Sequence, residues 1–575
     1  MSKNKQAAFQ RLYTREGRAL PAVPWERYPR PQLVRKEWLC LNGDWELRFG
    51  GQETRILVPF CPESLLSGVD QPPEPGEGMR YRRTFAVPES WRGRRVLLHF
   101  GAVGREAAVS VNGKEVCRNL NGYLPFSADI TDALREGENE LTVTAVNDLS
   151  PRWPLGKQSK KRGGMWYTPC SGIWQTVWLE PVPESYVKSL RLRCGADFCE
   201  ITAEGVREGV VTLDGQAFPL RDGRARITLK EPHPWSPEDP HLCRFTLKSD
   251  EDTVESYFAL RTLSVETVGG VRRLCLNGRP YFFNALLDQG YWSDGLYTPA
   301  APELYEKDIL AMKSLGFNTL RKHIKLEPEQ FYYDCDRLGM IVFQDMVNNG
   351  VYRFLRDTIL PTLRMGKLPD TRLNPDPKTR AVFLDAMERT VRALSNHPCI
   401  CLWTIFNEGW GQFCADDTYR RLKALDPDRF IDSTSGWFHQ SLSDVDSLHI
   451  YFGKLRLGKE PLPQLLSEFG GYVWKDGAHS FNLRKTYGYR IYPTRERLVA
   501  ALRRLYGEAL PPLVRKGLCG AVYTQVSDVE DETNGLFTFD REILKVRPDE
   551  LRDLAEKLQE AVREYSHLCK QGPRA

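Results

Sequence analysis

The chain has 575 residues, of which 41% are hydrophobic and 27% are charged. A chain of this length can bury several apolar cores and is typical of about three domains. The 80 lysines and arginines nearly balance the 75 aspartates and glutamates, which leaves a net charge of +5. This balance indicates neither a nucleic-acid partner nor a membrane-surface partner. A mostly neutral substrate of modest size fits the composition better.

The 14 cysteines are scattered without regular spacing, and many lie in apolar runs such as Cys399-Ile400-Cys401. We interpret them as reduced thiols of a cytoplasmic protein. The cysteines and the nine histidines form no clustered ligand set, so neither a metal nor another cofactor is predicted. No export signal and no apolar run of about 18 residues stands out, so no membrane partner is expected. The oligomeric state stays open, with a homo-oligomer as one alternative.

Two consecutive regions show the short alternating segments of all-β domains. In residues 1–183, apolar and polar residues alternate from Trp38 onward, and Asn112-Gly113 is typical of a two-residue hairpin turn. Residues 184–263 carry a second hairpin signal at Asp214-Gly215 and have the length of an immunoglobulin-like sandwich. The sequence therefore predicts two β-sandwich domains ahead of a third domain.

In the third region, residues 264–575, strand-like runs alternate with amphipathic helices. Strands are predicted at residues 281–287, 317–321, 340–345 and 400–406, and near Phe430, Leu448, Leu465 and Ala521. Helices are predicted at residues 302–315, 327–338, 378–395, 495–514 and 548–567. Eight strand positions indicate a (β/α)8 barrel, whose active site lies at the C-terminal ends of the strands. The segment at residues 351–379 would lie on that face, either as a wall of the pocket or as a surface loop.

Two glutamates stand at informative positions of this barrel. Glu408 comes after the fourth predicted strand and Glu468 after the seventh. Each alone is more often a solvated or ion-paired carboxylate. Together they fit double displacement at an anomeric carbon, which needs a proton donor and a nucleophile about 5 to 5.5 Å apart. Glu408 would need a raised pKa to stay protonated near neutral pH, whereas Glu468 must stay ionised.

Several motifs resemble those of glycoside hydrolase family 2 and occur in that family's order. The stretch from Asn396-His-Pro to Asn407-Glu408 resembles the acid/base signature, and Leu466-Ser-Glu-Phe-Gly470 resembles the nucleophile segment. Other matching stretches are LNGDW at residues 41–45, GIWQTVW at 172–178, PWSPEDP at 234–240, FALR at 258–261 and GFNTLR at 316–321. The resemblance covers nearly the whole chain. It implies a jelly-roll-like sugar-binding β-sandwich, an immunoglobulin-like β-sandwich and a catalytic TIM barrel.

The resemblance also implies roles for single residues. Glu408 would be the general acid/base and Glu468 the nucleophile of a retaining mechanism. Asn407 would hydrogen-bond the sugar 2-hydroxyl, Arg321 would steer the Glu468 carboxylate, and Tyr451 would hydrogen-bond it. The alternatives are a strand-end turn residue at Asn407, a structural ion-pair partner at Arg321 and core packing at Tyr451.

Four further residues are candidate substrate contacts, at positions where the sequence departs from the better-known members. His323 precedes Ile-Lys where the family often has His-Tyr-Pro, and it is either a substrate contact or a residue of the rim. Asp345, in Gln-Asp where many β-galactosidases have Asp-Glu, would bind a sugar hydroxyl. Asp288 and Trp292, after the first strand, are similar candidates. The metal-binding residues of large β-galactosidases cannot be mapped onto this sequence, and the retaining mechanism itself needs no metal.

The activity implied is that of an exo-acting β-glycosidase on terminal non-reducing sugars, with a β-galactosidase-like enzyme as the leading expectation. β-Mannosidase, β-glucuronidase, β-galacturonidase and α-L-arabinosidase activities on the same scaffold stay open, because the difference between them depends on a few hydroxyl contacts. A non-catalytic carbohydrate-binding protein is the alternative from another class. The expected partner is therefore a carbohydrate or glycoside substrate.

The eighth strand bears on the charge of the sugar. β-Glucuronidases of the family carry an Asn-x-Lys element there that grips the sugar carboxylate, whereas this chain has Glu532 and Asn534 at those two places. A uronate would meet no cation from this element, so little glucuronidase activity is predicted. Lys325 and the loop at residues 158–162 are the other candidate sources of a cation.

Overall fold

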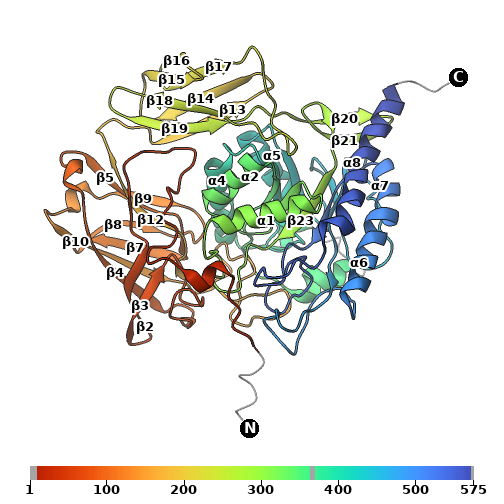
Figure 1. Cartoon of the computed structure of the whole chain (residues 1–575), viewed down its shortest axis with the longest axis horizontal. Coiled ribbons are helices and arrows are strands. Elements are labelled where there is room, and N and C mark those ends of the chain that lie inside the picture. The colour runs from red at the N-terminus through yellow and green to blue at the C-terminus, as the bar shows by residue number, and fades with distance from the viewer. Residues whose placement is uncertain (1–8, 363–368, 571–575) are drawn as a thin grey trace, which may run out of the picture.

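The computed structural model describes residues 9–362 and 369–570. Figure 1 shows the first β region, in red to orange, beside the barrel, in green to blue, with the second β region in yellow above them. The fold class that the sequence predicts is confirmed. None of the helices within the described ranges is both long and apolar enough to cross a membrane.

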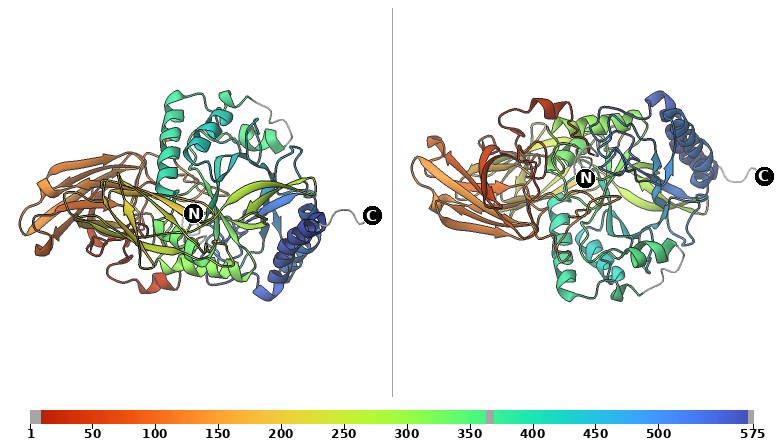
Figure 2. Two further views of the ribbon diagram at one scale, coloured as in Figure 1. Left: turned by 90° about the horizontal axis from the view of Figure 1, so that it is seen from above. Right: turned by 90° about the horizontal axis from the view of Figure 1, so that it is seen from below.

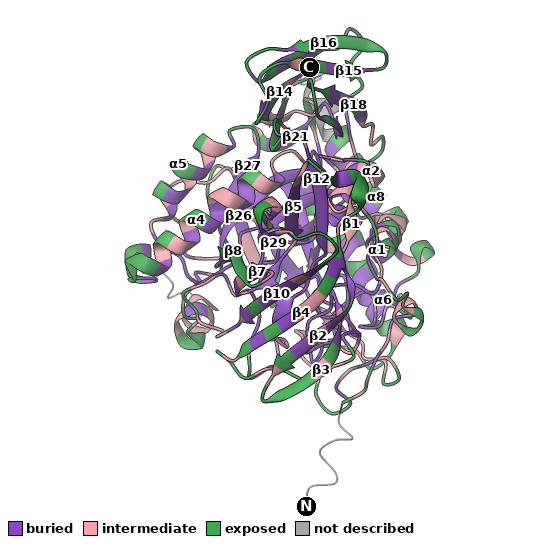
Figure 3. Ribbon diagram, turned by 90° about the vertical axis from the view of Figure 1, so that its left-hand side faces the viewer, coloured by how far each residue is buried: buried purple, intermediate pink, exposed green. Residues whose placement is uncertain are grey.

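The N-terminal region is a sandwich of two antiparallel sheets around one apolar core. The larger sheet has the order β3-β2-β4-β10-β7-β8, and the smaller has the order β1-β12-β5-β9. The strands are β1 (Leu39–Cys40), β2 (Gly43–Phe49), β3 (Gln52–Val58), β4 (Gly78–Ala86), β5 (Arg95–Phe100), β7 (Glu106–Val111), β8 (Lys114–Asn119), β9 (Phe126–Asp129), β10 (Glu138–Val146) and β12 (Val177–Val182). Along β10, Leu141, Val143 and Ala145 are buried and the residues between them face outward. Figure 3 shows the same alternation of buried and exposed residues on β2 and β4.

The second sandwich packs a sheet of order β13-β14-β17 against one of order β16-β15-β18-β19, again around one core. Its strands are β13 (Ser189–Cys194), β14 (Phe198–Glu204), β15 (Gly209–Leu213), β16 (Gln216–Leu220), β17 (Arg224–Thr228), β18 (Cys243–Lys248) and β19 (Thr253–Phe258). Both predicted hairpin turns are confirmed. Asn112 and Gly113 join β7 to β8, Asp214 and Gly215 join β15 to β16, and all four residues have positive φ.

Eight parallel strands form the barrel in the order β27-β26-β25-β24-β23-β32-β29-β28. They are β23 (Phe283–Asp288), β24 (Thr319–Lys322), β25 (Ile341–Asp345), β26 (Ile400–Asn407), β27 (Phe430–Ser435), β28 (Asp446–Ile450), β29 (Gln464–Gly470) and β32 (Leu518–Thr524). The main helices are α1 (Glu303–Ser314), α2 (Glu329–Leu338), α4 (Pro377–Leu394), α5 (Ala415–Leu425), α6 (Arg495–Arg504), α7 (Pro511–Arg515) and α8 (Pro548–Lys570). All eight strand positions and all five predicted helical stretches are confirmed.

Two details differ from the prediction, the helix α5 and the predicted helix at residues 495–514, and two others depart from a regular barrel. The short helix α5 was not predicted, and only three of its residues are buried. Residues 436–445 and 451–463 form loops where the regular pattern would place helices after β27 and β28. The predicted helix at residues 495–514 divides into α6, a π-helical turn at Leu505–Ala509 and α7. No backbone ladder joins β27 to β28, the two strands at the ends of the sheet. The hydroxyl of Ser447 in β28 donates to the carboxylate of Asp432 in β27 at 2.9 Å.

The N-terminal sandwich lies directly against the barrel. Trp174 and Phe60 belong to the same apolar cluster as the barrel strands, and the Trp25 indole N–H donates to the Pro299 carbonyl at 2.8 Å. Figure 2 shows the sandwich on one side of the barrel and α8 on the other. This packing brings residues 147–171, the long connection that follows β10, to the face where the barrel strands end.

Candidate active site

The C-terminal ends of the barrel strands gather most of the predicted site residues. Arg321 lies in β24, Asn407 ends β26 and Glu468 lies in β29, while Glu408 and Tyr451 directly follow β26 and β28. Four of these five, Arg321 excepted, line one small cavity. Larger cavities of about 230 and 460 Å³ lie elsewhere in the described residues, and none of the predicted site residues lines them.

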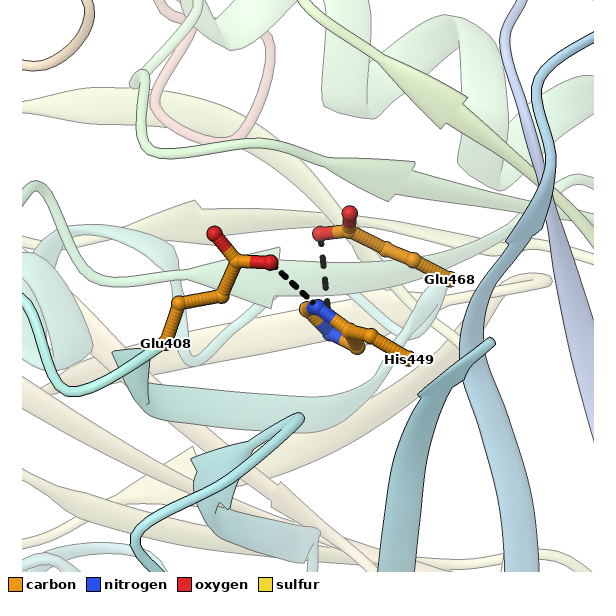
Figure 4. Close-up of side chains that lie close together, drawn as sticks. All are labelled: Glu408, His449 and Glu468. Carbon is orange, nitrogen blue, oxygen red and sulfur yellow. Dashed lines mark hydrogen bonds and ion pairs between the residues drawn. The ribbon is translucent and has the colours of Figure 1, made fainter. Parts of the chain in front are cut away.

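The carboxylates of Glu408 and Glu468 face each other across this cavity, with His449 between them (Figure 4). One oxygen of each carboxylate and a ring nitrogen of His449 all lie within 4.8 Å of one another. Glu408 has φ of +54°, which non-glycine residues rarely adopt. Such a conformation persists only where the surrounding structure holds it.

Arg321 is 1% exposed, and its guanidinium makes hydrogen bonds to several residues of the site. Its Nη1 donates to Glu468 Oε1 at 3.0 Å and to the Ser467 carbonyl at 2.9 Å, and its Nε donates to Asp345 at 3.0 Å. Its Nη2 donates to Asn407 Oδ1 at 2.8 Å. Because a guanidinium donates only, this last bond fixes the Asn407 amide with its NH2 group free to donate elsewhere.

The nucleophile candidate is held in its ionised form. Burial raises the pKa of Glu468, but the charges of His449 and Arg321 outweigh burial and lower it to about 2. Tyr451 donates its hydroxyl to the other Glu468 oxygen, and its ring stacks on Tyr489 with centroids 3.5 Å apart. Glu468 is therefore an anion at neutral pH, with both oxygens oriented.

His449 was missed by the sequence interpretation. Its Nδ1 lies 2.8 Å from Glu408 Oε1, and its Nε2 lies 3.0 Å from the Ser435 hydroxyl and 3.6 Å from Glu468 Oε1. Gly436 makes room for the ring, since a Cβ there would stand 2.8 Å from Nδ1. The available signal was the spacing of His449 and Tyr451, because residues two apart share one face of a strand.

His323 and Asp345 form a pair beside Arg321. Asp345 binds Arg321 through one oxygen and His323 Nδ1 through the other at 2.7 Å, and it is 1% exposed. His323 lines the cavity and Asp345 does not. Burial lowers the pKa of His323, and the nearby Lys157 ammonium lowers it further. The structure thus places Asp345 behind the cavity wall, where both its oxygens are occupied.

Asp288 and Trp292 are not brought to the cavity. The Asp288 carboxylate accepts from Lys322 Nζ at 2.6 Å and from the Gly290 amide at 2.9 Å. Trp292 is 2% exposed and lies beneath the Arg541 guanidinium, which is 4.2 Å from the centre of its ring. The residue after Asp288, Gln289, lines the cavity in its place.

The N-terminal region also contributes to the cavity, through the loop at residues 147–171. Lys157, Met165 and Trp166 line it, and sequence interpretation missed all three. Lys157 forms no ion pair with any carboxylate in the described ranges. Lys325, which the sequence offered as a cation source, is instead bound to Glu327 and to two backbone carbonyls. Spacing along the chain cannot reveal such contacts, because they arise from the docking of one domain on another.

The segment at residues 351–379 takes part in the site through Tyr352, which lines the cavity. Residues 363–368 lie outside the described residues. Trp437 connects the described part of the segment to Glu408, because its indole N–H lies 3.0 Å from the Asp357 carbonyl and 3.1 Å from the Glu408 carbonyl. At least the start of this segment therefore shapes the pocket.

The site has one donor set that could hold a metal ion, among the residues that the structure describes. It consists of Glu408, His449 and Glu468. The same three groups already satisfy one another by hydrogen bonding and ion pairing, and Glu468 is also bound by Arg321. A metal would thus compete with contacts that orient the two carboxylates.

Two family models match the chain. Residues 40–183 match the sugar binding domain of glycosyl hydrolases family 2, and residues 274–457 match the TIM barrel domain of the same family. Together they cover more than half of the chain.

Two similar proteins are β-galactosidases. That of Aeromonas hydrophila subsp. hydrophila is 28% identical over an alignment of 468 positions, which covers 72% of this chain and 43% of that protein. That of Klebsiella pneumoniae is 24% identical over 64% of this chain and 36% of that protein. The chain therefore spans about two fifths of the length of these relatives.

Two solved structures share the fold over almost the whole chain. A β-D-glucuronidase from Dictyoglomus thermophilum matches with a TM-score of 0.71 and 20% identity, over 93% of this chain and 98% of that one. A β-galacturonidase from Eisenbergiella tayi, bound to galacturonate, matches with a TM-score of 0.67 and 21% identity, over 92% and 98%. At such identities the likeness shows the fold alone. The family models, with the fold they describe, show that this chain belongs to glycoside hydrolase family 2.

Proposed function

We propose that the chain is a retaining exo-acting β-glycosidase that removes terminal non-reducing sugars by double displacement. The observation that carries this proposal is the pair of carboxylates, Glu408 and Glu468, with oxygens within 4.8 Å of each other in one cavity. Retaining enzymes hold their two carboxyl groups about 5 to 5.5 Å apart, whereas inverting enzymes leave room for a water between them. The fixed ionisation of Glu468 suits a nucleophile.

In the first step, a Glu468 oxygen attacks the anomeric carbon and the bond from that carbon to the glycosidic oxygen breaks. Glu408 gives its proton to the departing oxygen, so the leaving group departs as a neutral alcohol. In the second step, Glu408 takes a proton from water, the water oxygen attacks the anomeric carbon, and the bond to Glu468 breaks. Two inversions return the β configuration.

The surrounding residues have supporting roles in this proposal. The Asn407 amide NH2, left free by the bond to Arg321, would donate to the sugar 2-hydroxyl, a contact that strengthens in the transition state. Arg321 and Tyr451 position Glu468 and stabilise its charge before attack. Asp345 acts through Arg321 and His323, as a positioning residue.

We further propose a neutral sugar, with a β-galactoside as the leading substrate. The eighth-strand element contributes Glu532 to the cavity, where its carboxylate accepts from Asn534 at 3.0 Å and from the Tyr167 hydroxyl. An anionic sugar would face this carboxylate, and two unit charges 4 Å apart interact by about 4 kcal/mol at an effective dielectric of about 20. Lys157 is the only lysine or arginine among the described cavity-lining residues, and its charge would oppose that of Glu532.

The experiment that tests the proposed function is a panel of nitrophenyl β-glycosides, with the anomer of the first product followed by NMR. We expect turnover of at least one neutral glycoside and release of the β-anomer. A protein that binds these sugars without turnover would favour the non-catalytic alternative.

A further inference from the structure

Three aromatic side chains meet beside Glu408, and they come from three separate parts of the chain. Trp166 lies in the N-terminal loop at residues 147–171, Tyr352 lies beyond β25, and Trp410 follows Glu408 by two residues. The ring centroids are 5.1 Å apart for Trp166 and Tyr352, 5.2 Å for Trp166 and Trp410, and 5.8 Å for Tyr352 and Trp410. Each pair is edge to face, and all three rings line the catalytic cavity.

Two of the three rings are tied in place. The Trp410 indole N–H donates to the Gly350 carbonyl at 2.9 Å, and the Tyr352 hydroxyl bonds to Thr358. Trp166 differs from them, because it is only half-buried and its indole N–H has no partner within the described ranges. Its ring is nevertheless held by edge-to-face contacts with Tyr352 and Trp410, and the next residue, Tyr167, is fully buried and bonded to Glu532. Trp166 therefore presents a rigid ring with an unused donor.

The trio lies on the side of the leaving group. A general acid must reach the glycosidic oxygen, so the group beyond that oxygen lies next to the acid. Trp410 is joined to the acid's own turn, because its amide N–H donates to the Asn407 carbonyl at 3.0 Å. Tyr352 is close enough for Glu408 to affect it. Burial is the main cause that raises the pKa of the Tyr352 hydroxyl, and the charge of Glu408 raises it further.

Exposed apolar side chains stand close to Tyr352 in the sequence. Val351, Phe354 and Leu355, all within three residues of Tyr352, are 57%, 60% and 65% exposed. Large apolar side chains gathered on a surface usually mark a binding site. Here they neighbour Tyr352 in the chain, and the Tyr352 ring lines the catalytic cavity.

We propose that Trp166, Tyr352 and Trp410 form a subsite for an aromatic aglycone, so that the natural substrates are β-glycosides of phenols or of similar flat apolar groups. This inference rests on the proposed function. A flat ring can stack on the half-buried Trp166 ring, and the indole N–H can donate to an oxygen substituent of the aglycone. A second sugar would need several hydroxyl partners, whereas the trio offers a single free donor.

The test compares two substrates that carry the same sugar. This sugar is the one whose nitrophenyl β-glycoside the protein hydrolyses in the panel. The β-glycosyl fluoride has no aglycone and reports only on the sugar subsite and the two carboxylates. The 4-nitrophenyl β-glycoside reports on both subsites. We expect Trp166→Ala to lower kcat/KM for the nitrophenyl glycoside by about three- to tenfold, the size of one aromatic contact, and to leave kcat/KM for the fluoride unchanged. Trp166→Phe should stay close to the unmodified protein.

Trp153→Ala is the matched control, because Trp153 belongs to the same loop and lines a different small cavity. Trp153→Ala should leave kcat/KM unchanged for both substrates. Equal losses on both substrates with Trp166→Ala would indicate a purely structural role and overturn the aglycone subsite, as would an unchanged nitrophenyl rate. An unmodified protein that turns over neither substrate would overturn the proposed function, and this inference with it.

Discussion

The imidazole of His449 joins the two proposed catalytic carboxylates, with Nδ1 2.8 Å from Glu408 and Nε2 3.6 Å from Glu468. The Ser435 hydroxyl, 3.0 Å from Nε2, completes the contacts of the ring nitrogens. One side chain thus contacts both the proton donor and the nucleophile, and it orients the donor. His449 is a positioning residue in this account, since it acts through the two glutamates.

Replacing His449 by alanine should lower kcat/KM by about 100-fold, because Glu408 loses the bond that aims it. The loss should be largest for poor leaving groups, which depend on the proton. A leaving-group series of aryl glycosides measures this dependence. His439→Ala is the control, since His439 bonds to no carboxylate of the described cavity. An equal loss across the whole series would show that His449 only supports the fold.

Removal of each of the two glutamates should impair turnover in a different way. Glu468→Ala should abolish turnover of every substrate, because no glycosyl-enzyme can form. Glu408→Ala should chiefly harm substrates with poor leaving groups, since a good leaving group departs without a proton. Added azide should partly restore Glu408→Ala and give a β-glycosyl azide. An α-azide from this variant would require the two roles to be exchanged.

The low pKa of Glu468 predicts a particular dependence of stability on pH. The pKa is about 2 in the folded protein and near the ordinary glutamate value of 4.5 in the unfolded chain. A depressed folded-state pKa stabilises the fold fully above the unfolded value, and this stabilisation is lost as pH falls from about 5 to about 2. The Glu468→Gln variant lacks this stabilisation at every pH. The Tm difference between the unmodified protein and Glu468→Gln should therefore shrink over that range, and a constant difference would contradict the assignment.

The cavity charges predict a preference for neutral sugars. We expect kcat/KM for nitrophenyl β-galactoside to exceed that for the β-glucuronide, because the Glu532 carboxylate would repel a uronate. Glu532→Gln should narrow the gap and Lys157→Met should widen it, which makes the two variants controls for each other. A tenfold preference of the unmodified protein for the glucuronide would show that the eighth strand has been misinterpreted.

Much of the fold could be predicted from the sequence, because barrel strands are short apolar runs and most of their helices have a clear apolar period. The helix α5 was missed, whereas residues 436–445 and 451–463, for which no helix was predicted, form loops. The two glutamates, Asn407 and Tyr451 were predicted to lie at one face, and the structure brings them together.

The rest of the site depends on contacts that cannot be predicted from the spacing of residues in the sequence. Lys157 and Trp166 reach the cavity only because the N-terminal sandwich docks on the barrel. Asp288 and Asp345 end their strands as expected, but Lys322 and Arg321 occupy their carboxylates, so neither lines the cavity. Position at a strand end predicts nearness to a site, whereas the neighbouring side chains decide whether an oxygen stays free for substrate.

The most direct test of the central claim is covalent trapping of the nucleophile. A 2-deoxy-2-fluoro glycosyl fluoride of the preferred sugar should inactivate the protein, because the 2-fluorine slows both steps whereas the good fluoride leaving group speeds only the first, so the glycosyl-enzyme accumulates. Peptide mapping should then find the sugar esterified to Glu468, within residues 463–470. Label on Glu408, or an inverted first product by NMR, would contradict the account.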